Sequence, residues 1–156
     1  MKNTARAVMQ TRFTMLSPHD TIKEAVIVLQ SASKEHGRRV FGMMVTDQEG
    51  KLVGMLSMYD IFLFLRPKHI EIWGEMDDID LTGLVGEALS RADTIRVGDV
   101  MTTSLISITP DTNLMMIVDI MIKKHVRRLP VLDGKEIVGI VFMSDVFDYL
   151  LEKFMQ

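Results

Sequence analysis

Apolar and polar residues alternate with two periodicities along this chain, one typical of amphipathic helices and the other of short strands. In the first half, apolar residues recur at helical spacing at Ile22, Ala25, Val26 and Leu29. In the second half, RLPVLDGKEIVGIV carries two apolar runs around Asp133 and Gly134, residues that tolerate the positive φ of a tight turn. Short alternating stretches at 13–16 and 105–108 each lead into a proline turn and a helix. The pattern therefore predicts strand, helix, hairpin and closing helix in each half.

The two halves of the chain carry the same sequence pattern. VMQTRFTMLSPHDTIKEAVIVL matches VMTTSLISITPDTNLMMIVDIM at an offset of 92, which relates Met9 to Met101 and Pro18 to Pro110. LVGMLSMYDIFLFL matches IVGIVFMSDVFDYL at an offset of 85. The first half therefore has seven extra residues, one in the hairpin turn and six around SKEHGRRVFG. We expect this insertion to lie in a loop.

The repeated pieces resemble a known family. The VM-x-T opening, the LPVLDG hairpin and the endings GMLSMYD and GIVFMSD occur in the order seen in CBS (cystathionine-beta-synthase) domain pairs, here as a stand-alone Bateman module. The resemblance implies an α+β fold of tandem CBS repeats, β-α-β-β-α twice, packed as a pseudo-twofold pair with two clefts at the shared interface. It divides the chain into repeat 1 (1–66), a linker with a helical turn or two (67–97) and repeat 2 (98–156).

Composition narrows the functional classes. A chain of 156 residues cannot hold a large catalytic barrel, and 47% hydrophobic with 25% charged residues is typical of a folded globular protein. The net charge of -3 gives no field that would attract nucleic acid or an anionic membrane. The absence of cysteine excludes disulfides and a thiol nucleophile, and fits the cytoplasm. We also expect no signal peptide and no membrane span.

The first candidate binding group is Ser57 with Asp60, directly after the last predicted strand of copy one. A hydroxyl and a carboxylate at a helix start lie beside free backbone N–H groups, where they could hold a ribose and a phosphate. In similar proteins the Asp binds the ribose hydroxyls and the Ser or Thr lies near the phosphate. The alternative is a capping box that only satisfies the first helical turn.

Copy two departs from this motif. Phe142 replaces the serine, Asp145 keeps the carboxylate, and Ser144 offers a hydroxyl two positions later. We therefore expect two unequal clefts, with the Asp60 side the more complete.

A second duplicated constellation is basic, SKEHGRRV in copy one and KKHVRRLP in copy two. Guanidinium and imidazole groups match phosphate geometry. The resemblance supports phosphate contacts for His125, Arg127 and Arg128, whereas the insertion displaces the cluster of copy one, Lys34, His36, Arg38 and Arg39. The alternative is that these cations complement a helix C-terminus and otherwise face water.

Apolar residues are candidates for contact with a purine. In similar proteins the base lies against segments that correspond to Thr14, Ile106 and Pro130. The chain also has 14 methionines, which could line an adaptable pocket, although core packing is the simpler interpretation. The six that we considered are Met43, Met44, Met55, Met115, Met116 and Met121.

Two further features concern partners and metals. The stretches IFLFL (61–65) and VFDYLLEKFM (146–155) are apolar nearly all round, more than a monomer of this size buries easily. CBS pairs commonly form a flat dimer through these closing helices, and we expect a homodimer here. The acidic segment EIWGEMDDID lacks the spacing of a calcium loop, so we expect a solvated loop and no metal.

These observations favour a regulatory module over an enzyme. The chain has no cysteine, Walker loop or G-x-G-x-x-G motif. We expect no obligatory cofactor and a ligand such as AMP, ADP, ATP or S-adenosylmethionine in the cleft between the repeats, with a separate effector protein as the receiver of the signal. The alternative is a partner-binding and dimerisation scaffold with vestigial clefts.

Overall fold

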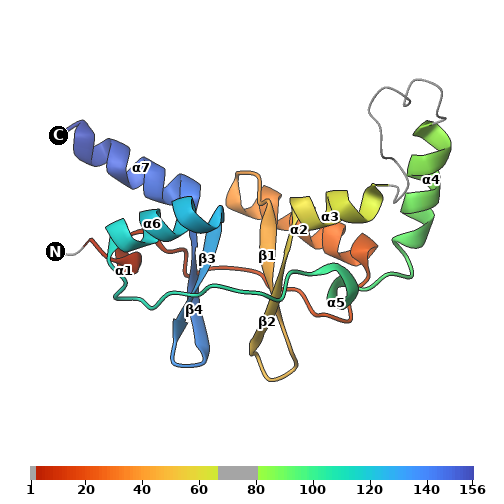
Figure 1. The fold of residues 1–156 in the computed structure, drawn as a ribbon, viewed down its shortest axis with the longest axis horizontal. Helices are drawn as coiled ribbons and strands as arrows, with labels where there is room; N and C mark the ends of the chain where they lie inside the picture. The colour runs from red at the N-terminus through yellow and green to blue at the C-terminus, as the bar shows by residue number, and fades with distance from the viewer. Residues whose placement is uncertain (1–2, 67–80) are drawn as a thin grey trace. The chain divides into compact units, whose positions relative to one another are not determined.

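The computed structural model describes residues 3–66 and 81–156, which form two compact units, each built around one antiparallel hairpin (Figure 1). The β1–β2 unit contains β1 (Gly42–Thr46) and β2 (Leu52–Ser57) and draws on Thr14–Gln48 and Leu52–Ser104. The β3–β4 unit contains β3 (Arg128–Asp133) and β4 (Glu136–Phe142) and draws on Met1–Phe13, Glu49–Lys51 and Leu105–Gln156.

Helices complete each unit. The β1–β2 unit has α2 (Ile22–His36), the closing helix α3 (Met58–Leu65), α4 (Leu81–Arg91) and α5 (Val97–Val100). The β3–β4 unit has α1 (Ala5–Val8), α6 (Leu114–Lys124) and the closing helix α7 (Met143–Phe154). The 11 residues of α4 make about three turns, so the helix in the linker is longer than the sequence predicted.

Both hairpins have a register shift at the same place, between Val45 and Thr46 in one and between Val131 and Leu132 in the other. There, Leu16 forms a parallel bridge with Val45, and Ile108 forms one with Val131. The prediction of strands at 13–16 and 105–108 is thus wrong, because only one residue of each stretch pairs with a hairpin. A proline turn follows each bridge at once, and proline has no N–H with which to extend the ladder.

The insertion of copy one lies mostly in a helix, which corrects the loop expected from the sequence. The α2 helix has 15 residues and its counterpart α6 has 11, so four of the six extra residues lengthen α2. A capping box of Thr21 and Glu24 begins α2, and Gly37 at φ 67° ends it. The backbone N–H of Thr21 donates to Glu24 and holds the pKa of that carboxyl below its usual value, with the Thr21 hydroxyl adding to the effect.

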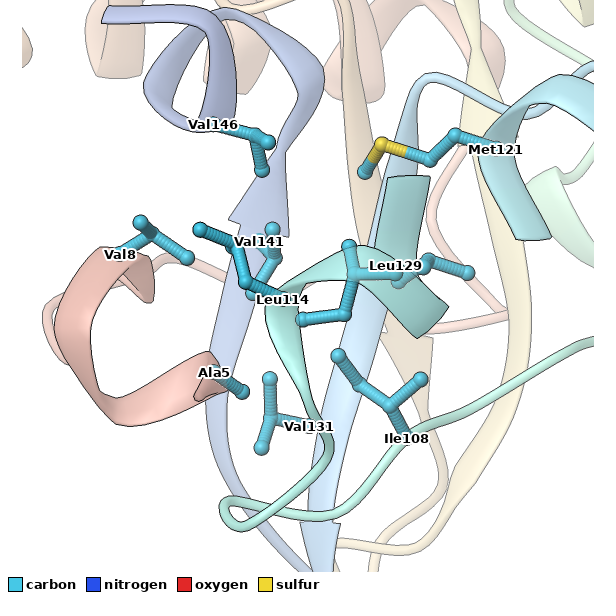
Figure 2. Close-up of a cluster of buried hydrophobic side chains, with 10 residues drawn as sticks. Ala5, Val8, Ile108, Leu114, Met121, Leu129, Val131, Val141 and Val146 are labelled. Carbon is cyan, nitrogen blue, oxygen red and sulfur yellow. The ribbon is translucent and has the colours of Figure 1, made fainter. Parts of the chain in front are cut away.

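The hydrophobic core of the β3–β4 unit combines residues from the two ends of the chain (Figure 2). Ala5 and Val8 of α1 belong to the same buried cluster as Val141 of β4 and Val146 of α7. The core of the β1–β2 unit likewise combines residues from distant parts of the chain, since Val97 of α5 belongs to a buried cluster formed by residues of the first repeat. Removal of such apolar side chains from water is the main stabilising term for each unit.

Each unit is completed by the opening segment of the other sequence repeat. We define the opening segments as residues 4–10 and 96–102, the second of which includes the last two residues of the linker. The first is bridged to the second repeat through Thr4 with Asn113 and Gln10 with Ile140. The second is bridged to the first repeat through Arg96 with Thr21 and Thr102 with Met55. Each compact unit therefore combines most of one sequence repeat with the opening segment of the other. We call this arrangement the exchange of opening segments.

A glycine makes each of these exchanges possible. A Cβ atom at Gly139 would lie 2.9 Å from the Gln10 carbonyl oxygen and 3.0 Å from the Met9 sulfur. At Gly54 it would lie 2.5 Å from the Met101 sulfur and 3.1 Å from the Thr102 carbonyl oxygen. The opening segments thus lie against the hairpins at a distance that only glycine permits.

We expect Gly139→Ala to lower the free energy of unfolding by about 1–3 kcal/mol, because the new methyl group forces the backbone of the opening segment away from β4. Urea denaturation followed by far-ultraviolet circular dichroism measures this. The matched control is Gly86→Ala in α4, where an added Cβ meets nothing within 4 Å. That control should gain about 0.5–1 kcal/mol from helix propensity. An unchanged stability for Gly139→Ala would contradict the close approach.

Candidate functional site

Ser57 and Asp60 form a capping box at the start of α3. The Asp60 N–H donates to the Ser57 hydroxyl (3.3 Å), and the Ser57 N–H donates to Oδ2 of Asp60 (2.9 Å). The Ser57 hydroxyl in turn donates to the same Oδ2 (3.1 Å). The capping alternative is therefore confirmed as geometry. The ribose and phosphate roles of these residues stay predictions. We call this pair the α3 carboxylate site.

Asp60 has a further partner from the opening segment of repeat 2. The Thr102 hydroxyl donates to Oδ1 of Asp60 at 3.0 Å. Asp60 is only 7% exposed, so its carboxylate lies under the side chains that bind it. The Ser57 and Asp60 motif, the more complete of the two in sequence, is thus also the one whose carboxylate is more enclosed by neighbouring side chains.

The second copy differs at the start of α7. Phe142 occupies the N-cap position and makes no capping bond through its side chain. Asp145 is half-buried, and its Oδ2 accepts a hydrogen bond from Nε2 of Gln10 (3.1 Å). Ser144 is exposed. We call Ser144 and Asp145 the α7 carboxylate site.

Sequence reasoning missed Gln10 and Thr102. They occupy equivalent positions, each directly after the opening methionine, and each donates to the carboxylate that begins a closing helix. The repeat alignment shows a polar residue at this position in both copies, but it gives no sign of the partner. That partner lies in the other repeat, and only the exchange of opening segments brings the two together.

Arg127 and Arg128 lie where the β3–β4 hairpin meets α7. The carbonyl of Arg127 accepts the N–H of Met143, the first residue of α7, at 2.8 Å, and Arg128 pairs with Phe142 across the hairpin. The structure therefore brings both arginines to the end of the unit that holds the α7 carboxylate site. The N-terminus of a helix with nearby cations is a favourable environment for an anion.

His125 is exposed and ends α6 at φ 54°, where the other copy has Gly37. The corresponding cations of copy one are placed differently, since Lys34 and His36 lie in the last turn of α2. Their position fits the alternative in which cations complement a helix C-terminus.

The three residues expected against a purine base differ in exposure and belong to both units. Thr14 is exposed in the β1–β2 unit, and Ile106 packs at the edge of the core of the β3–β4 unit. Pro130 is fully buried in β3, with its carbonyl accepting the N–H of Ile108 at 3.0 Å. Their contact with a base stays a prediction.

The methionines divide into two groups. Core packing is confirmed for four of them, which are buried: Met43, Met44, Met55 and Met121. It is wrong for Met115 and Met116 of α6, which are 64% and 54% exposed. These two thioethers lie on the surface because they face away from the buried residues Leu114 and Ile117 of the same helix.

Within residues 3–66 and 81–156, no three acidic or histidine side chains are grouped to hold a metal ion. Among the same residues, no helix combines the length and the apolar character that a membrane span needs. The acidic stretch noted in the sequence, 71–80, lies outside the described residues.

Comparison with known proteins identifies the family. The CBS domain family matches residues 5–67 and 97–152, which together make up most of the chain. This chain belongs to the CBS domain family. The α+β fold of tandem CBS repeats is thereby confirmed, although neither predicted first strand extends beyond a bridge residue. A relative, the CBS domain-containing protein YhcV of Bacillus subtilis, is 28% identical over 144 residues, which are 92% of this chain and 83% of YhcV.

Solved structures of CBS pairs share the fold. The CBS-pair protein CBSX2 from Arabidopsis thaliana has a TM-score of 0.76 at 23% identity, with 100% of this chain and 99% of that one covered. CBSX2 in complex with AMP has a TM-score of 0.70, also at 23% identity, over 97% and 98% of the two chains. The CBS domain pair of MJ0100, solved with 5-methylthioadenosine and S-adenosyl-L-methionine, has a TM-score of 0.68 at 18% identity, over 98% and 99%. At these identities the likeness shows the fold alone.

We expect Ser57→Ala to lower the free energy of unfolding by about 0.5–2 kcal/mol, because α3 loses its N-cap acceptor and the donor to Asp60. Thermal or urea denaturation measures this. Ser144→Ala is the matched control at the start of α7. It should change stability by less than about 0.5 kcal/mol, since Ser144 is exposed and the N-cap of that helix is Phe142. Equal losses in the two variants would show that the α3 capping box is unimportant.

Proposed function

We propose that the chain is a non-catalytic regulatory module that binds an adenine nucleotide or adenosyl compound. The observation that carries this proposal is duplicated: a carboxylate begins each closing helix, and in the second copy two arginines lie at the same end of the unit. A carboxylate can accept the hydroxyls of a ribose, while guanidinium groups can hold a phosphate. The AMP bound to CBSX2 and the adenosyl ligands bound to MJ0100 support the same ligand class.

We assign the principal binding role to the α7 carboxylate site. Asp145 is half-buried and Ser144 is exposed, so a ligand can reach them, whereas Asp60 is 7% exposed and held by its own neighbours. This reverses the order expected from the motif, in which the Asp60 side was the more complete. His125, Arg127 and Arg128 belong to the same unit as Asp145. They are the proposed phosphate contacts.

Regulation requires that the ligand prefer one arrangement of the protein. A nucleotide that binds one conformation more tightly shifts the population toward it, by at most the difference between the two affinities. The receiver in our proposal is a separate effector protein. The shared cleft between the repeats and the cytoplasmic location stay predictions.

We expect purified protein to bind at least one of AMP, ATP and S-adenosylmethionine saturably in isothermal titration calorimetry. Asp145→Asn should weaken that binding by about 10- to 100-fold, because charge-assisted hydrogen bonds to the ribose are lost. The matched control is Asp111→Asn, which removes an exposed carboxylate of the same unit that pairs with Arg6 (3.1 Å). Absence of heat with all three ligands would reject the proposal and favour the scaffold alternative.

The closing helices support a second element of the proposal, a homodimer. Both helices expose a methionine and a phenylalanine at equivalent positions, Met58 and Phe62 on α3, and Met143 and Phe147 on α7. On α7 the exposed apolar residues continue with Leu151 and Phe154. Large apolar side chains at helical spacing form a surface that a second copy could cover.

We expect wild-type protein to be a dimer in size-exclusion chromatography with light scattering, and Phe147→Glu to be a monomer, because the charge would be buried in the dimer. Phe147 is 59% exposed, so the substitution is tolerated by the single chain. Met116→Glu on α6, where the side chain is 54% exposed, is the control and should remain a dimer. A monomeric wild type, or a dimeric Phe147→Glu variant, would show that α7 is not the interface.

A further inference from the structure

The hydrogen bonds of Asp60 can be compared with what a ribose requires. An ionised carboxylate has about four lone-pair sites, two on each oxygen. Oδ2 of Asp60 accepts from the N–H and the hydroxyl of Ser57, at 2.9 Å and 3.1 Å, so both of its sites are used. Oδ1 accepts from the Thr102 hydroxyl at 3.0 Å. A single acceptor site is left, on Oδ1, on a residue that is 7% exposed.

The vicinal diol of a ribose donates two hydrogen bonds. A single remaining acceptor site cannot take both, so a diol can bind Asp60 in this manner only if one of the present donors leaves. Loss of the Ser57 N–H would leave a part-buried backbone donor unpaired at the start of α3, which is costly. The Ser57 hydroxyl is half-buried and is also held by the Asp60 N–H that it accepts. The Thr102 side chain is exposed, so its hydroxyl can turn to water at the lowest cost of the three donors.

Thr102 can release Asp60 without moving its backbone. Its N–H donates to the Met55 carbonyl and its carbonyl accepts from the Met55 N–H, both at 2.9 Å. These two bonds hold the opening segment against β2 whatever the hydroxyl does. The equivalent residue of the other copy, Gln10, has the same backbone pairing, with Ile140, and also donates to the carboxylate of its closing helix. A donor from the opening segment is therefore a repeated feature of both units.

We propose that the Thr102 hydroxyl is a competitor built into the fold that closes the α3 carboxylate site to a ribose. This inference rests on the proposed function, since it assumes that the chain binds a ribose-containing ligand at the α7 carboxylate site. It adds that at the more buried carboxylate, Asp60, the bond from the opening segment takes an acceptor site that the ribose needs. Removal of that group opens the α3 site to a second molecule of the same ligand.

The test uses AMP as the probe and the full chain in isothermal titration calorimetry. Wild-type protein binds a single molecule of AMP per chain, and Thr102→Val binds a second, because valine keeps the branched shape of threonine and lacks the donor. Thr102→Ser restores the hydroxyl and with it the single molecule of the wild type. In the double variant Thr102→Val with Asp60→Asn the second molecule is lost again, which assigns it to Asp60.

A measurement without ligand keeps the two proposals separate. Thr102→Val shifts the urea midpoint to a lower concentration than Thr102→Ser, because only valine removes the bond to Asp60. An unchanged midpoint would show that this bond is unimportant and would overturn the inference. So would a single molecule of AMP bound by Thr102→Val, or two bound by wild type, and either result leaves the proposed function standing. Absence of AMP, ATP and S-adenosylmethionine binding in every variant overturns the proposed function and this inference together.

Discussion

The structure depends on the close approach of each opening segment to a glycine in the middle of a hairpin. At Gly139 the Gln10 carbonyl oxygen lies where a Cβ atom would otherwise be, and at Gly54 the Met101 sulfur does the same. The backbone pairing of Gln10 with Ile140 and of Thr102 with Met55 follows from this contact. So does the place of α1 and α5 in the cores of the units. A side chain at either glycine would push the opening segment away from its hairpin and so weaken both the bridge and the packing of the short helix in the core.

The same contact connects the fold to the candidate sites. Once the backbone of an opening segment is paired with β2 or β4, the side chain after the opening methionine lies beside the first turn of the closing helix. The donor to each carboxylate is therefore supplied by the other sequence repeat. A change that shifts an opening segment alters the stability of a unit and the environment of its carboxylate at once. A regulatory module needs such coupling, because its ligand must favour one arrangement of the chain.

The sequence predicted local features better than it predicted the exchange. The hairpins, the closing helices and the capping box at Ser57 depend on residues close together in the chain, where turn chemistry and periodicity apply. The extra turn of α2 could have been predicted, because Lys34 and Glu35 are good helix formers and the first residue suited to end the helix is Gly37. The sequence analysis instead placed the whole insertion in a loop. The partners of Gln10 and Thr102 could not be predicted, because a repeat match shows which residues are equivalent and not which half they pack against.

Several differences between the copies support our proposal that the β3–β4 unit holds the ligand. In copy one, Gly37 takes the left-handed conformation without strain, and Asp60 is enclosed by Ser57 and Thr102. In copy two, His125 takes the same conformation at a cost of about 1–2 kcal/mol for a residue with a Cβ atom. Strain of this kind is concentrated at functional sites in proteins. The strained residue His125 lies in the same unit as Arg127, which adjoins α7, and Asp145, which is half-buried. The less complete sequence motif therefore belongs to the more accessible of the two carboxylates.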